Sequence, residues 1–122
     1  MKMSKRILAL LLAVVAIVGL FAGCAATDNG GNDAQIKVGF IFLHDENSTY
    51  DLNFIKGAEE ACANLGLEDS QVIFKTNIPE GQEAYDAAID LVEQGCSFIF
   101  ADSFGHEDYI IQAAKENPEV QF

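Results

Sequence analysis

The apolar run Val38–Leu43 constrains the fold more than any other stretch of this 122-residue chain. It changes abruptly into the polar segment His44–Asp51, and a helical pattern follows at once. A near-continuous apolar run of this length is typical of a strand that is covered on both faces. Such strands belong to parallel sheets, because the crossover helices lie on the faces of the sheet. The run therefore predicts a buried parallel strand over Ile36–Leu43.

Strand and helix patterns alternate from this point to the end of the chain. Two more strands are predicted at Gln71–Lys75 and Cys96–Ala101, and Glu119–Phe122 looks like the entry to a fourth. The intervening segments carry apolar residues at helical spacing, which predicts amphipathic helices packed on a sheet. Their predicted buried stripes are Ile55, Ala58, Cys62 and Leu65, then Ala84, Ala88, Leu91 and Val92, then Ile110, Ala113 and Ala114 in a helix over Tyr109–Glu116. The predicted fold class is α/β, a parallel sheet with helices on both faces.

Punctuating residues support these boundaries. Ser48, Thr49 or Asp51 can cap the first helix, and Gly66 and Gly95 each follow a helix, where glycine adopts a left-handed conformation.

Polar loops follow the first and third predicted strands. In open α/β sheets ligands bind outside the carboxyl ends of the strands, so His44–Asp51 and Asp102–Asp108 are expected to face a binding crevice. Each candidate also has a structural alternative. Tyr50 can pack on the rim of the sheet, and Asp102 and Ser103 can cap the next helix. Asp45 can be a solvated loop acid and Phe104 a core residue.

The first residues do not read as part of the fold. Met1–Arg6 is basic, Ile7–Phe21 is apolar apart from Gly19, and small residues lead to Cys24. This pattern is typical of a secretory signal, and a membrane span would need about 20 apolar residues. Phe21–Cys24 resembles the lipobox of bacterial lipoproteins, which implies cleavage before Cys24 and its lipidation. We therefore expect a signal peptide over 1–23, a lipidated Cys24 with a flexible tether over 24–35, and an extracytoplasmic, membrane-anchored protein.

Charge and cysteine content exclude some classes. Three of the seven Lys and Arg residues lie in Met1–Arg6, so the remainder carries four against nineteen acidic residues, a net charge of −15. Such acidity argues against nucleic acid as a partner. Cys62 and Cys96 are expected to be unpaired, buried thiols, although an extracytoplasmic location would permit a disulfide.

Five segments in order resemble the BMP family, the basic-membrane-protein or PnrA-like substrate-binding lipoproteins of ABC importers. They are Lys37–Phe42, Tyr50 seven residues before Gly57, Asn77–Gly81, Ala101–Gly105 with Asp108, and Asn117–Phe122. The resemblance implies the N-terminal lobe of a type I periplasmic-binding-protein fold, here incomplete over 36–122. It also implies a purine nucleoside or related ligand, no cofactor, and ABC permease subunits as partners.

The resemblance also suggests individual roles. Tyr50 matches the aromatic residue that stacks on the base, and Asp45 is the nearest candidate for a ligand-contacting carboxylate. Ser103, Phe104 and Gly105 match a Ser-Phe-Gly turn, with Asp102 beside it.

Three other readings compete with this one. A ligand-binding sensor or receptor lipoprotein can use the same fold. A metal-binding lipoprotein would use His44 and His106, each followed by acidic residues at the end of a strand. An enzyme is not expected, because Ser103 lacks the Gly-x-Ser-x-Gly elbow and no Lys follows a glycine-rich turn.

Overall fold

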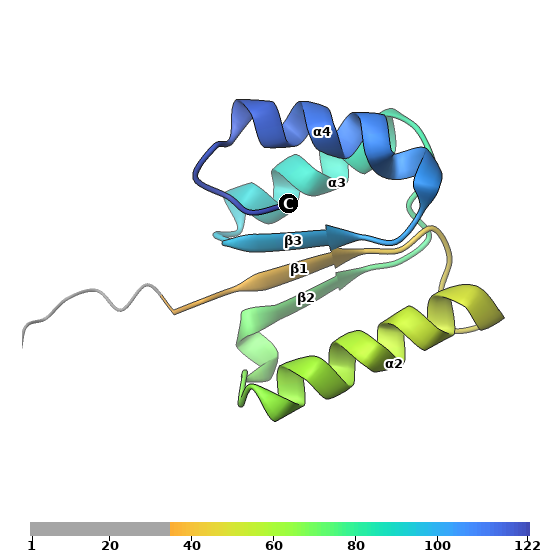
Figure 1. Ribbon diagram of the computed structural model, residues 1–122, viewed down its shortest axis with the longest axis vertical. Coiled ribbons are helices and arrows are strands. Elements are labelled where there is room, and N and C mark those ends of the chain that lie inside the picture. Colours follow the sequence, from red (N-terminus) through yellow and green to blue (C-terminus); the bar gives the residue numbers. More distant parts are fainter. Residues whose placement is uncertain (1–34) are drawn as a thin grey trace, which may run out of the picture. The chain divides into compact units, whose positions relative to one another are not determined.

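The computed structural model describes residues 35–122, which form a three-layer α/β unit (Figure 1). Its strands are β1 (Val38–Ile41), β2 (Val72–Lys75) and β3 (Phe98–Ala101), and its helices are α2 (Thr49–Asn64), α3 (Gln82–Glu93) and α4 (Glu107–Glu116). Short 3-10 turns at Asp69–Gln71 and Phe104–His106 lead into β2 and α4. The predicted signal peptide, Cys24 and nearly all of the tether lie outside the described residues. None of the described helices is both long and apolar enough to cross a membrane.

All three strands are parallel, in the order β2-β1-β3, which confirms the predicted sheet. The strands are shorter than predicted because the ends of each apolar run continue as loop. Gln121 forms an isolated parallel bridge with Phe98 on the outer edge of β3. Its N–H donates to the Ser97 carbonyl at 3.0 Å. The predicted fourth strand is thus present as a single bridge.

Helices cover both faces of the sheet, as predicted: α2 lies on one face and α3 with α4 on the other (Figure 1). The core sits mainly beneath α3 and α4, where Ile41, Leu91 and Ile99 are fully buried. Gly39 of the central strand faces Leu91, and a Cβ at residue 39 would lie 2.7 Å from Leu91 Cδ1. This glycine lets α3 approach the sheet closely.

The α2 face of the sheet carries a row of phenylalanines. The Phe40 ring in β1 stacks between Phe74 of β2, at 5.1 Å between centroids, and Phe100 of β3, at 5.3 Å. The strand register pairs Phe40 with both of these residues. We call Phe74, Phe40 and Phe100 the phenylalanine row.

One packing expectation and one structural alternative are wrong. Leu65 was expected in the buried stripe of α2, but it is 76% exposed. It is the C-cap residue after the last helical turn, just before the chain reverses at Gly66 with φ 71°, and it borders an open apolar hollow beside Val38 and Phe98 of the sheet. Phe104 is not a core residue: it is 90% exposed, because it starts a 3-10 turn at the rim.

Other local expectations are confirmed. Ser48 is the N-cap of α2, and its side chain accepts a hydrogen bond from the Asp51 N–H. Gly66 and Gly95 have positive φ at the ends of α2 and α3. Cys62 and Cys96 are buried and unpaired. The last helix starts two residues earlier than the predicted Tyr109, at Glu107.

Candidate functional site

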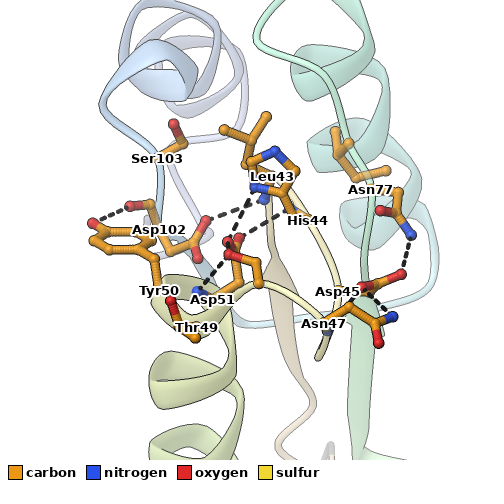
Figure 2. A network of polar contacts seen from close by, with 12 residues as sticks. Leu43, His44, Asp45, Asn47, Thr49, Tyr50, Asp51, Asn77, Asp102 and Ser103 are labelled. Atoms are coloured by element: carbon orange, nitrogen blue, oxygen red, sulfur yellow. Dashed lines mark hydrogen bonds and ion pairs between the residues drawn. The ribbon is translucent and has the colours of Figure 1, made fainter.

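The carboxyl ends of the three strands bring three loops together at one edge of the sheet, which we call the rim. Because β1 is central, its loop (42–48) lies between the loops that follow β2 (76–81) and β3 (102–103). Hydrogen bonds tie the central loop to both neighbours (Figure 2). Asp45 Oδ2 accepts from Asn77 Nδ2 at 3.3 Å on one side, and the Leu43 N–H donates to Asp102 Oδ1 at 3.2 Å on the other. Tyr50 Oη, in the first turn of α2, also donates to the Asp102 carbonyl at 3.3 Å.

Asp51 is the buried charge beneath this rim. It is 1% exposed and lies in the first turn of α2. Its carboxylate accepts hydrogen bonds from Ser48 Oγ at 2.5 Å, from the His44 N–H at 2.9 Å and from His44 Nδ1 at 3.1 Å. Burial raises the pKa of this carboxyl, but the hydrogen bonds from Ser48 and His44 outweigh burial and hold the pKa at about 2. Asp51 is therefore ionised and fixes the path of the loop.

The pKa of Asp102 is shifted in the direction opposite to that of Asp51. Its Oδ1 accepts a hydrogen bond from the Leu43 N–H at 3.2 Å, whereas its buried Oδ2 has no partner among the described residues. Burial raises the pKa of Asp102, the Leu43 hydrogen bond opposes that rise, and the neighbouring charge of Asp51 adds to it. A buried acceptor without a partner, together with a raised pKa, marks Asp102 as a candidate functional residue.

Asp45 is occupied within its own loop. Oδ1 accepts from the Asn47 N–H at 3.0 Å and from Asn47 Nδ2 at 2.9 Å. These bonds, with the one from Asn77, lower its pKa. Asp45 thus shapes the loop and links it to the β2–α3 connection, and a ligand would have to share its oxygens.

Tyr50 is the exposed aromatic group of the rim. Its side chain is 58% exposed, and its ring lies 4.9 Å from the ring of Phe54, tilted by 52°. The hydroxyl bond to Asp102 turns the ring toward the β3 loop (Figure 2). The structural alternative was that the ring packs on the rim of the sheet. Because Tyr50 is largely exposed, such packing covers only part of the ring.

Two pockets meet at Asp102. One, of about 430 Å³, lies between α2 and the sheet and is lined by the rings of Phe42, Phe54 and Phe100. The other, of about 480 Å³, lies on the α4 side and includes Ser103 and Phe104. Asp102 therefore borders two hollows that both contain phenylalanine rings, an arrangement suited to a flat ligand that carries N–H or O–H donors.

Of the sequence-predicted residues, the structure brings Tyr50 and Asp102 into contact, and it places Ser103 and Gly105 next to Glu80. Ser103 does not cap a helix: its Oγ donates to Glu80 Oε1. Sequence reasoning did not single out Asp51 or Glu80 as site residues. The Ser48-x-x-Asp51 spacing of a capping box was the available signal for Asp51, whereas nothing local pointed to the contact of Glu80.

The two histidines of the metal-binding alternative, His44 and His106, lie in different environments. His44 is exposed and bonded to Asp51, whereas His106 is fully buried with Nε2 donating to the Ile78 carbonyl at 2.9 Å. Within residues 35–122, no group of three or more His, Cys, Asp or Glu side chains is arranged to hold a metal ion.

Comparison with known proteins finds relatives along most of the chain. An ABC transporter nucleoside-binding protein, BmpA, from Lactococcus lactis subsp. cremoris is 27% identical over 98% of this chain. The chain resembles ABC transporter binding proteins. A purine-binding protein from Brucella abortus is 28% identical over 91% of the chain. These relatives confirm the resemblance drawn from the sequence, although no family model matches the chain.

A solved structure confirms the fold. The ABC transporter solute-binding protein from Conexibacter woesei superposes with a TM-score of 0.59 over 70% of this chain and 27% of its own length, at 17% identity. The chain spans about a third of the curated relatives it matches, 36% and 31% of their lengths.

Proposed function

We propose that the protein is the substrate-binding component of an ABC importer and that it binds a purine nucleoside or a closely related ligand. The named activities of the two curated relatives support this proposal. The observation that carries it is the pair at the rim: an exposed Tyr50 ring bonded to the backbone of Asp102, whose Oδ2 has no partner among the described residues.

The chemistry of that pair fits a nucleobase. The Tyr50 ring offers a face on which a base can stack, and stacking of this kind contributes about 1–3 kcal/mol with tolerance for different bases. Asp102 Oδ2 can accept a hydrogen bond from a ring N–H or an exocyclic amino group. In this proposal Asp45 and Asn77 hold the loop that presents Tyr50, while Ser103, Phe104 and Gly105 form the adjoining wall.

The role in transport is binding without catalysis. A second lobe closes over the ligand, and the permease subunits recognise the closed form. The protein is held on the extracytoplasmic face of the membrane by a lipid on Cys24, after removal of residues 1–23. Labelling with a clickable fatty acid tests the anchor, with Cys24→Ala as the control. Equal labelling of both proteins would contradict it.

Calorimetric titration of the full-length protein tests the ligand. Guanosine, inosine and adenosine are compared with cytidine, and at least one purine nucleoside is expected to bind more tightly. Tyr50→Ala is expected to weaken that binding by about 1–3 kcal/mol through loss of stacking. Tyr50→Phe keeps the ring and loses only an exposed hydrogen bond, so it serves as the matched control. Unchanged affinity in Tyr50→Ala would refute the stacking role.

A transport assay separates an importer from a sensor of the same fold. A strain that lacks the protein is expected to lose uptake of the labelled nucleoside, and the wild-type gene is expected to restore it. Full uptake in the deletion strain, together with nucleoside binding by the purified protein, would favour the sensor.

A further inference from the structure

Glu80 lies in the connection between β2 and α3, yet its carboxylate reaches the loop that follows β3. Ser103 Oγ donates a hydrogen bond to Glu80 Oε1. Gly105 lies beneath the same carboxylate, and a Cβ at that position would collide with it. The absence of a side chain at Gly105 is therefore what lets the carboxylate approach the loop. The Glu80 carboxylate thus contacts two residues of the proposed ligand wall, Ser103 and Gly105.

The backbone that carries Glu80 is tied down on both sides. Asn77 adopts a left-handed conformation, φ 56°, and its side chain donates to Asp45. The Ile78 N–H donates to a β1-loop carbonyl at 3.0 Å, and the Ile78 carbonyl accepts from the buried His106 ring at 2.9 Å. Glu80 therefore projects from a loop that is hydrogen-bonded to both neighbouring loops, so its exposed carboxylate is already aimed at the rim.

Several carboxylates lie near Glu80. Asp102 and Glu107 line the pocket that contains Ser103, and Asp45 lies on the other side of the β2–α3 loop. The lysines of the described residues lie elsewhere: Lys37 bonded to the Gln94 carbonyl, Lys56 in the middle of α2, Lys75 paired with Asp90, and Lys115 in the last turn of α4. A rim of carboxylates without a nearby lysine repels an anionic group.

We propose that Glu80 is a specificity-determining residue, whose carboxylate accepts a hydrogen bond from a sugar hydroxyl of the ligand and excludes a ligand that carries phosphate. The bond from Ser103 uses Oε1 and leaves Oε2 as an acceptor at the rim. Hydrogen bonds to an ionised acceptor are about twice as strong as neutral ones. The same charge that favours a hydroxyl disfavours a phosphate. This inference rests on the proposed function.

The test is a set of calorimetric titrations of the full-length protein with guanosine, 2′,3′-dideoxyguanosine and guanosine 5′-monophosphate. Glu80→Gln keeps the shape of the side chain and its bond with Ser103 but removes the charge. Glu59→Gln, an exposed change in the middle of α2, is the control for net charge. Glu80→Gln is expected to bind guanosine about tenfold more weakly and to lose most of the preference for guanosine over the monophosphate, whereas Glu59→Gln changes neither.

The outcomes separate the two proposals. If the wild type binds no nucleoside, the proposed function fails and this inference fails with it. If the wild type binds guanosine and Glu80→Gln has the same affinities for all three ligands, only the role of Glu80 is overturned. A loss of guanosine affinity with no change in the preference over the monophosphate, or an equal change in Glu59→Gln, also overturns it. Circular dichroism of both variants checks that they are folded.

Discussion

Replacing Asp51 by asparagine removes a buried charge from the first turn of α2 while it keeps the shape of the side chain. In the folded protein Asp51 is 1% exposed and accepts hydrogen bonds from Ser48 and His44. The fall of its pKa from the ordinary 3.8 to about 2 corresponds to about 2.4 kcal/mol of folding free energy at neutral pH. Asp51→Asn should lose about this amount, because the amide keeps one acceptor and places a donor opposite existing donors.

The stability difference between wild type and Asp51→Asn should depend on pH. A carboxyl whose folded-state pKa is depressed stabilises the protein above its unfolded-state pKa, and that stabilisation is lost as the pH falls through the folded-state pKa. The difference in unfolding free energy between wild type and Asp51→Asn should therefore be full at pH 7. It should shrink below about pH 4 and vanish near pH 2.

Urea denaturation followed by circular dichroism measures that difference. At pH 7 the midpoint of thermal unfolding should also fall by about 10–20 °C for a domain of this size. Asp86→Asn, on the exposed face of α3, is the matched control and should change stability by less than about 0.5 kcal/mol. A loss below about 0.5 kcal/mol in Asp51→Asn would refute the reasoning. A loss that stays constant from pH 7 to pH 2 would show that packing, not charge, was removed.

Three further changes should separate the other contributions to stability, each measured by urea denaturation. Asp102→Asn should leave the protein as stable at pH 7 or more stable, because the pKa of Asp102 is raised and its buried carboxylate is unfavourable there. The gain should shrink as the pH falls through the raised folded-state pKa and be gone below the ordinary value of 3.8, and a clear loss at pH 7 would contradict this. Ser48→Ala should cost about 1–2 kcal/mol through loss of the α2 cap, with Ser70→Ala, exposed in a 3-10 turn, as the control. Gly39→Ala should cost about 1–3 kcal/mol, because its Cβ would overlap the fully buried Leu91; a neutral result would mean that α3 can shift freely.

The sequence was sufficient for the sheet, because its signal is local. The apolar run after Ile36 is long enough to indicate a buried strand, each helix shows its own apolar period, and the first two helices each end at a glycine, Gly66 and Gly95. The parallel order of the strands then follows from the alternation of strand and helix.

The site was predictable only in part, because its contacts join residues far apart in the chain. Tyr50 and Asp102 could be placed at the same edge, since both follow strands of one sheet. Their hydrogen bond, and the contact of Glu80 with Ser103, depend on how the loops fold back. The sequence left Asp45 as a ligand contact or a solvated loop acid, and it did not predict that its oxygens accept hydrogen bonds from Asn47 and Asn77. Leu65 has the spacing of a buried helix residue, but it lies beyond the last helical turn and is exposed.

The phenylalanine row has a consequence for how the chain tolerates insertions and deletions. Phe74, Phe40 and Phe100 are register partners, and each lies one residue before the end of its strand. The three rim loops therefore begin at the same level. An inserted residue within one strand would lift its loop by about 3.3 Å and turn the following side chains to the opposite face. Relatives that differ in ligand should thus vary in the sequence and length of the rim loops, while the spacing from each phenylalanine to its strand end stays fixed.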